Sequence, residues 1–174
     1  MAGGEFIGES RVRELLEDFS GALDMLDDYD HENLKRHKGT PGGAAVSVAE
    51  ARSVIDEMRF SSESELFGKE KDDSFAGSLG NVFQTYLGTE LYPSFEEKAA
   101  NLFYFLVKNH SFLDGNKRIA AALFIYFLYK NNRLYENGRK RISDETIVAM
   151  TLMVASSRPE EKELMISVII NFLA

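Results

Sequence analysis

Nine consecutive residues carry side chains suited to phosphate chemistry. They are His-Ser-Phe-Leu-Asp-Gly-Asn-Lys-Arg at positions 110–118, and they lie between two apolar runs, 102–107 and 119–128. The segment combines a proton acceptor, a carboxylate, an amide and two cations. A polar cluster between two apolar helical patterns is unfavourable to pack, so a function explains it better than folding does. Its composition indicates that the function is the handling of phosphate.

The end of this segment predicts an anion-binding turn. We expect a helix to begin at Asn116 or Lys117, and the first backbone N–H groups of a helix are unpaired and carry partial positive charge. Gly115 lets the backbone approach a phosphate closely. Arg118 adds a planar two-pronged donor for phosphate, and Lys117 adds a point charge.

Two further side chains of the segment have the chemistry to take part in a reaction. His110 can accept a proton near neutral pH, and Asp114 supplies the hard oxygen that Mg²⁺ prefers. Each residue alone also has a structural explanation, because a histidine at a helix end is commonly a cap and Asp-Gly-Asn is commonly a turn. Together, between two buried helices, they favour a functional site.

Composition limits the classes of partner. The chain has 174 residues and a net charge of −8, and general affinity for nucleic acid is unexpected because it requires a basic surface. A basic group after the motif could focus an anionic ligand beside it, although a solvated hairpin explains it equally well. The absence of cysteine suits a reducing cytoplasm, and no apolar run is long enough to span a membrane. The basic group consists of Lys130, Arg133, Arg139, Lys140 and Arg141.

Hydrophobic periodicity predicts a mainly α-helical chain. Capping boxes at Ser47 and Ser94 predict the starts of two helices. Asn137-Gly138 predicts a type I′ hairpin over 133–142. The expected helices cover 10–29, 47–58, 75–86, 95–107, 117–130, 143–156 and a last segment from Pro159.

The sequence predicts that the chain is divided into an N-terminal region and a separate domain. A glycine-rich stretch from His31 to Gly43 indicates a loop or linker. We therefore expect an N-terminal helical preface and linker over 1–60 and a catalytic domain over 61–174. The first residues of that domain, 61–74, are charged and irregular in pattern.

Residues 110–118 resemble the signature of the Fic/Doc family and meet every fixed position of it. The signature is His-x-Phe-x-(Asp or Glu)-(Gly or Ala)-Asn-(Gly or Lys)-Arg, and the resemblance extends over roughly residues 75–173. It implies an all-α fold, a Fic-type helical bundle with a central motif helix and one or two short β-hairpins. The remainder of the chain resembles the C-terminal half of RhuM-type bacterial proteins.

The family resemblance also implies a role for each motif residue. His110 would be the general base that takes a proton from a target hydroxyl. Asp114 would hold Mg²⁺ on the phosphates of ATP or another nucleoside triphosphate, the co-substrate. The backbone from Gly115 to Lys117, with the Asn116 side chain, would form the anion hole, and Arg118 would steady a terminal phosphate.

In this family a hairpin, the flap, precedes the motif helix and clamps the target by strand addition. The candidate flap here runs from Thr85 to Tyr92. An ordinary surface turn is a near-equal alternative. The residues expected to bind the target are Thr85, Tyr86, Leu87, Gly88 and Thr89.

Three positions bear on the reaction or depart from the usual pattern. Lys117 stands where members that transfer AMP usually have glycine, and it matches Doc, which phosphorylates its target. Because a long cation would crowd an α-phosphate in the anion hole, Lys117 favours phosphoryl transfer. Ala121 replaces a second arginine that AMP-transferring members often carry, and Ser111 replaces the usual proline.

The expected function is a protein-modifying transferase that moves AMP or a phosphoryl group to a Ser, Thr or Tyr hydroxyl of a protein. A non-catalytic nucleotide-binding or protein-interaction module is the alternative. No segment fits the inhibitory pattern Ser/Thr-x-x-x-Glu-(Gly or Asn) of the family. A separate antitoxin or an N-terminal regulatory region is therefore the expected restraint, and the oligomeric state is open.

Overall fold

The computed structural model describes residues 7–174, which form two compact units. The division falls after Lys35, whereas the sequence predicts it near residue 60. The difference arises because helix α3 (Val48–Arg59) packs against α6 (Asn116–Lys130) of the larger unit. Residues 1–6 of the expected preface lie outside the described residues.

The smaller unit consists of α1 (Glu9–Asp18) and α2 (Ser20–Asp30). The sequence predicts one continuous helix here, but Phe19 leaves the helical conformation with φ −110° and ψ 14°. The break coincides with Phe-Ser-Gly, three residues of modest or poor helix propensity. Neither helix contains a buried residue.

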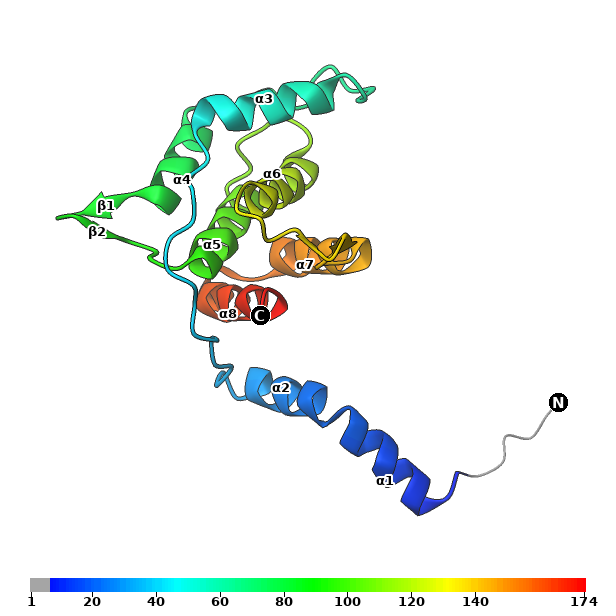
Figure 1. The fold of residues 1–174 in the computed structure, drawn as a ribbon. Helices are drawn as coiled ribbons and strands as arrows, with labels where there is room; N and C mark the ends of the chain where they lie inside the picture. The colour runs from blue at the N-terminus through cyan, green and yellow to red at the C-terminus, as the bar shows by residue number, and fades with distance from the viewer. Residues whose placement is uncertain (1–6) are drawn as a thin grey trace. The chain divides into compact units, whose positions relative to one another are not determined.

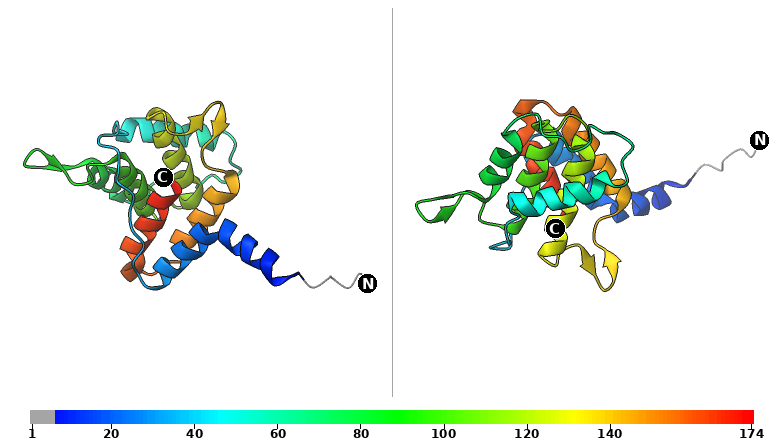
Figure 2. Two further views of the ribbon diagram at one scale, coloured as in Figure 1. Left: turned by 60° about the horizontal axis from the view of Figure 1, so that its bottom comes forward. Right: turned by 90° about the horizontal axis from the view of Figure 1, so that it is seen from above.

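Helices α5 (Phe95–Lys108) and α6 form the centre of the larger unit (Figures 1 and 2). Three other helices, α4, α7 and α8, pack against α5. The apolar run at 119–128 predicts a buried helix, and Ile119, Leu123 and Phe124 are inaccessible to solvent, although burial is confined to one stripe of α6 and Tyr129 is exposed. The remaining helical elements are α4 (Ser74–Phe83), α7 (Asp144–Ser156), the short 3₁₀ turn η1 (Pro159–Glu161) and α8 (Lys162–Phe172).

Local signals place the starts of three helices as predicted. The hydroxyls of Ser47 and Ser94 each accept the backbone N–H of the glutamate three residues later at 3.1 Å, which completes both capping boxes. Ser143 caps α7 in the same way. These bonds satisfy N–H groups that a helix leaves without intrahelical partners.

Two antiparallel hairpins complete the fold. Both turns have positive φ at two successive residues, Leu87-Gly88 and Asn137-Gly138, as type I′ turns require. The second hairpin is the one that the sequence predicts. The strands are β1 (Thr85–Tyr86), β2 (Thr89–Glu90), β3 (Tyr135–Glu136) and β4 (Arg139–Lys140).

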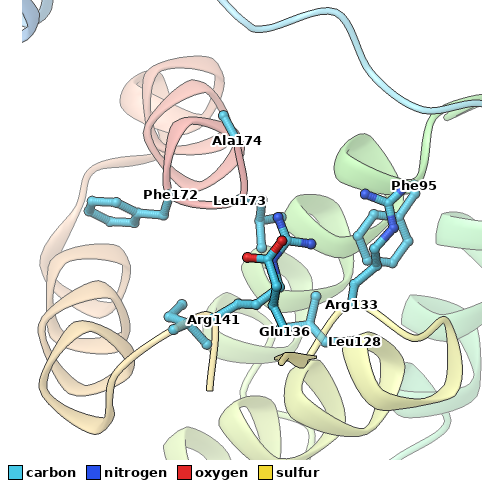
Figure 3. A pocket seen from close by; sticks show the side chains of 9 residues that line it. Phe95, Leu128, Arg133, Glu136, Arg141, Phe172, Leu173 and Ala174 are labelled. Atoms are coloured by element: carbon cyan, nitrogen blue, oxygen red, sulfur yellow. The ribbon is translucent and has the colours of Figure 1, made fainter. Parts of the chain in front are cut away.

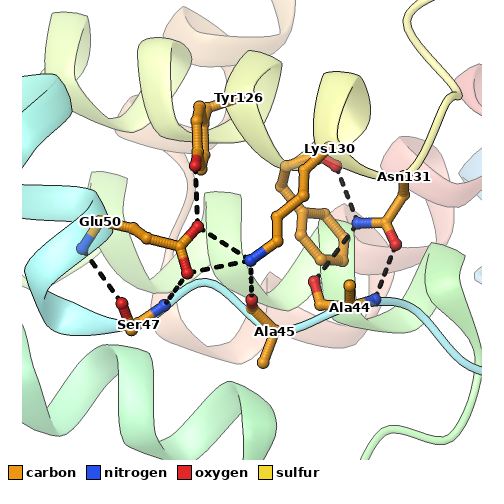
Figure 4. A network of polar contacts seen from close by, with 8 residues as sticks. Ala44, Ala45, Ser47, Glu50, Tyr126, Lys130 and Asn131 are labelled. Carbon is orange, nitrogen blue, oxygen red and sulfur yellow. Dashed lines mark hydrogen bonds and ion pairs between the residues drawn. The ribbon is translucent and has the colours of Figure 1, made fainter.

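A polar network joins α3 to α6 and fixes the segment before α3 (Figure 4). The Glu50 carboxylate accepts hydrogen bonds from Tyr126 at 2.7 Å and from Lys130 at 2.8 and 2.9 Å. Lys130 also donates to the carbonyl of Ala45, and Asn131 bonds the backbone of Ala44. These contacts, between residues about 80 positions apart, hold α3 on the motif helix.

The fold class predicted from the sequence is confirmed, since the described chain is mainly helical with two short hairpins. Within residues 7–174, none of the helices combines the length and the apolar character needed to cross a bilayer.

Candidate active site

The motif forms the connection between the two central helices. Asn109 ends α5, and Gly115 precedes α6 in the left-handed conformation with φ 90°. The turn brings His110 and Asp114 to the same loop as Lys117 and Arg118, at the start of α6. The site that the sequence predicts over 110–118 is therefore a short loop followed by the first turn of α6, with partly exposed polar groups.

His110 is exposed and has φ 45°. Its two neighbours fasten it to α4. Asn109 Nδ2 donates to Ser78 Oγ at 2.7 Å, and the buried Ser111 hydroxyl lies 2.7 Å from Ser74 Oγ. The backbone at His110 is thus held on both sides while the imidazole, which has no hydrogen-bond partner among residues 7–174, faces solvent.

Asn116 closes the loop on itself. Its Nδ2 donates to the Phe112 carbonyl at 2.8 Å, and its Oδ1 accepts the Phe112 N–H at 3.0 Å. Phe112 is buried and its ring packs on Phe75 with centroids 4.9 Å apart. The Asn116 Oδ1 and one of its two Nδ2 hydrogens are thus engaged with the Phe112 backbone, and these bonds fix the shape of the loop.

Residues 67–71, which we call the brace, pair with the motif loop like a short strand. The Lys71 N–H donates to the Ser111 carbonyl at 2.9 Å, and the Leu113 N–H donates to the Lys69 carbonyl at 2.8 Å. The Gly68 N–H donates to the Asp114 carbonyl at 3.0 Å. The sequence predicts only an irregular segment here, because its pairing partners lie 40 or more residues away.

Gly115 fits against the ring of Phe67. A Cβ at position 115 would overlap that ring, and φ 90° is already unfavourable for other residues. The same ring faces Arg118, whose guanidinium carbon lies 4.6 Å from the ring centroid. Glycine is therefore required here by the brace as well as by the turn.

The start of α6 has the features from which the sequence predicts an anion site. No side chain caps the helix, so no side-chain oxygen accepts a hydrogen bond from its first backbone N–H groups. Lys117 is exposed, and the Arg118 side chain is 60% exposed. These two cations lie on the first turn of the helix, where a bound phosphate would also meet the helix dipole.

Asp114 is suited to a nucleotide-bound Mg²⁺. Its carboxylate is partly exposed and lies 3.7 Å from Arg118 Nη2. Residues 7–174 contain no group of three or more carboxylate or histidine side chains that could hold a metal by themselves. A nucleotide-bound Mg²⁺ needs only one or two protein carboxylates, because phosphates and water complete its octahedron. A single carboxylate beside an anion site fits that requirement.

The candidate flap is a hairpin, as expected. Thr85 pairs with Glu90 and Tyr86 with Thr89. The tip is highly exposed, with Tyr86 at 77% and Leu87 at 88% of their full accessibility. Exposed strand edges can accept a further strand, so the hairpin has the form that target binding by strand addition requires.

The base of the flap is tied to α5 by a buried lysine that the sequence does not single out. Lys98 is only 1% exposed, and its ammonium group donates to Glu90 Oε2 at 3.0 Å. It also donates to the carbonyls of Gly42 and Pro93, at 2.8 and 3.3 Å. A buried ammonium group with three acceptors fixes β2 relative to α5.

The basic group after the motif does not lie beside the loop. It is at and beyond the last residue of α6, and the 15-residue helix separates it from the motif by about 20 Å. The cavity shown in Figure 3 lies at that far end and contains no motif residue. Its lining includes Arg133, Glu136 and Arg141. The expectation that these cations focus a ligand onto the motif is therefore not supported by the geometry.

The sequence matches the model of the Fic/DOC family over residues 13–128, more than half of the chain. The chain therefore belongs to the Fic/DOC family. The match includes the whole motif loop and most of α6.

One characterised relative is the toxin Doc of Mycolicibacterium smegmatis (strain ATCC 700084 / mc(2)155). The two are 45% identical over 47 residues, which is 27% of this chain and 36% of the toxin. The match thus spans little more than a third of that toxin. No solved structure matches the chain.

Proposed function

We propose that the protein is a transferase that moves AMP or a phosphoryl group from Mg²⁺-bound ATP, or another nucleoside triphosphate, to a hydroxyl of a protein. The observation that carries this proposal is the loop itself. It combines an exposed His110, the carboxylate of Asp114 and two cations at the uncapped start of α6. Membership of the Fic/DOC family supports a protein-modifying activity in general.

The loop supplies positioning, charge neutralisation and one base. The first N–H groups of α6, with Lys117 and Arg118, bind phosphate oxygens. Asp114 holds the nucleotide-bound Mg²⁺, which when present neutralises charge on the phosphates. These are the contributions that phosphoryl and nucleotidyl transfer need from a protein.

His110 removes the proton of the target hydroxyl. The hydroxyl oxygen then forms a bond to phosphorus while the bond from phosphorus to a bridging oxygen breaks. The released group is pyrophosphate when the α-phosphorus is attacked and ADP when the γ-phosphorus is attacked. The exposed imidazole, on a backbone fixed by Asn109 and Ser111, is accessible to such a hydroxyl.

Lys117 favours attack at the γ-phosphorus. It occupies the second residue of α6 and is exposed at the mouth of the anion site. A cation there attracts a terminal phosphate with its higher charge and leaves less room for a bridged α-phosphate.

The similarity to a Doc toxin supports an antitoxin as the natural inhibitor. The target is a protein with an accessible Ser, Thr or Tyr hydroxyl, held by the flap hairpin β1–β2 through Thr85 to Thr89. We place this activity in the cytoplasm, where ATP and Mg²⁺ are available.

The position of the transferred phosphorus can be tested with labelled ATP. The protein is incubated with a bacterial lysate and ATP labelled at either the α- or the γ-phosphate, and the proteins are separated. Label from the γ-position alone is the expected result, and label from the α-position alone would show AMP transfer. Absence of label from both positions, in the presence of Mg²⁺, would contradict the proposed function.

A further inference from the structure

We propose that the brace, residues 67–71, is a positioning element for the anion site, with Phe67 orienting Arg118 and with α3 as its support. This inference rests on the proposed function only for its effect on nucleotide binding. The orientation of Arg118 can be measured without any nucleotide.

The brace is fixed to the motif loop along its whole length. Backbone bonds join Gly68, Lys69 and Lys71 to the carbonyl or N–H groups of the loop. The loop is held from inside by the Asn116 amide, so the brace and that amide bracket the same short backbone. A displacement of the brace must therefore displace the loop or break these bonds.

Phe67 connects the brace to the reactive end of the loop. It is 1% exposed, and its ring lies against the Cα of Gly115 and under the guanidinium of Arg118. Arg118 has a 60% exposed side chain and one carboxylate neighbour at 3.7 Å. A long exposed side chain loses rotamer freedom when it binds a ligand, and the ring face reduces that loss by holding the guanidinium in advance.

The brace is supported by α3 and not by the motif helix. Arg59 Nε donates to the Phe67 carbonyl at 2.9 Å and its Nη2 donates to the Gly68 carbonyl at 2.6 Å. Arg52 forms two bonds of 3.1 Å with the Glu70 carboxylate, in a two-pronged arrangement. Two arginines two turns apart on one helix thus hold Phe67, Gly68 and Glu70 of the brace.

The attachment of the brace to α3 requires glycine at position 68. It has φ 69°, and a Cβ there would overlap the Ile55 side chain of α3. The brace can approach α3 closely only with glycine at this position. The chain of contacts from α3 to Arg118 therefore passes through backbone that has little freedom to adjust.

The experiment is a double-mutant cycle between Phe67 and Arg118, with Mg²⁺-ATP affinity measured by calorimetry. Phe67→Leu keeps an apolar side chain in the core but removes the ring face. We expect it to weaken binding roughly two- to five-fold in the wild-type background, from the strength of cation–π contacts. In the Arg118→Ala background it should have no further effect.

Phe103→Leu is the matched control, since Phe103 is equally buried and packs on Phe124. It should cost similar stability and leave nucleotide affinity unchanged. Equal losses from Phe67→Leu in both backgrounds would overturn the proposal. If Phe67→Leu does not fold, Arg52→Ala replaces it, because the Arg52–Glu70 pair is solvent-accessible.

The nucleotide-free measurement is the ¹⁵N relaxation of the Arg118 Nε–H group. We expect this group to be more ordered in the wild type than in Phe67→Leu or Arg52→Ala, and hydrogen exchange of the Leu113 amide to be faster in Arg52→Ala. Unchanged relaxation of Arg118 would overturn the brace proposal by itself. Failure of wild-type protein to bind Mg²⁺-ATP, with the relaxation change present, would instead contradict the proposed function.

Discussion

Ser111 shows how a single departure from the family signature is explained by its surroundings. The residue is buried, its hydroxyl lies 2.7 Å from Ser74 Oγ, and its carbonyl accepts the Lys71 N–H. Proline has no hydroxyl and could not make the first contact. Serine here joins the motif to α4, which is a structural reason that the sequence of the motif alone does not contain.

Asn116 has a structural role that can be measured separately from catalysis. Asn116→Ala removes two hydrogen bonds to the Phe112 backbone, and we expect it to lower the free energy of unfolding by about 1–3 kcal/mol. Urea denaturation measures this loss. Asn116→Asp keeps the acceptor for the Phe112 N–H and should lose less, so equal stability of all three proteins would contradict the role.

Lys117 is expected to influence which phosphorus is attacked. Lys117→Gly removes the long cation from the first turn of α6, so the ratio of α-label to γ-label transferred to protein should rise. Because glycine lowers helix stability by about 1 kcal/mol relative to alanine, Lys117→Ala is the control that separates side-chain loss from fraying. A ratio unchanged in both variants would show that Lys117 does not select the phosphorus.

At the level of elements, the attachment of α3 to α6 should depend on pH. The hydrogen bond from Lys130, followed by the one from Tyr126, lowers the pKa of Glu50 from 4.5 to about 2. A lowered pKa in the folded state stabilises the protein above pH 4.5, and this contribution is lost as pH falls toward 2. Glu50 is about one-third exposed, so solvent screening limits the contribution to about 1 kcal/mol.

Glu50→Gln tests this dependence through the free energy of unfolding measured at several pH values. The difference between wild type and variant should be largest near neutral pH and should shrink below pH 4.5. Glu57→Gln, on the same helix, is the control. If the difference in unfolding free energy stays constant across the acid range, the charge of the Glu50 carboxylate does not contribute to stability.

The attachment of the flap should affect the target and not the nucleotide. Lys98→Met keeps most of the buried volume but removes the ammonium group that joins Glu90 to α5. We expect a higher KM for the protein target, unchanged affinity for Mg²⁺-ATP, and a loss of about 1–3 kcal/mol in unfolding free energy. Glu90→Gln should reproduce the KM effect in weaker form. A fall in affinity for Mg²⁺-ATP would contradict this role, because it would show that Lys98 also affects nucleotide binding.

For the whole molecule, the sequence predicts features that depend on neighbouring residues. The capping boxes, the Asn137-Gly138 hairpin and the buried motif helix were all predicted from short segments. The polar side chains of the motif, at 110, 114 and 116–118, are brought together because they are close in sequence and the chain turns at the left-handed Gly115.

Features that depend on distant partners could not be predicted in this way. The brace forms only through backbone bonds to a loop about 40 residues later, and α3 belongs to the larger compact unit because it packs on α6. The Lys98 contacts depend on three separate segments. The basic group near the motif in sequence is distant in space because a rigid helix lies between them.

In the proposed function, the motif loop transfers a phosphorus-containing group with His110 as the base. The most direct test compares label incorporation from ATP into lysate proteins by the wild type, His110→Ala and His37→Ala. His37 is also exposed but lies outside the motif, so it is a matched control. Incorporation by wild type and His37→Ala but not by His110→Ala is the predicted result. Equal incorporation by all three proteins would contradict the assignment of the base, and none by any of them would contradict the proposed activity.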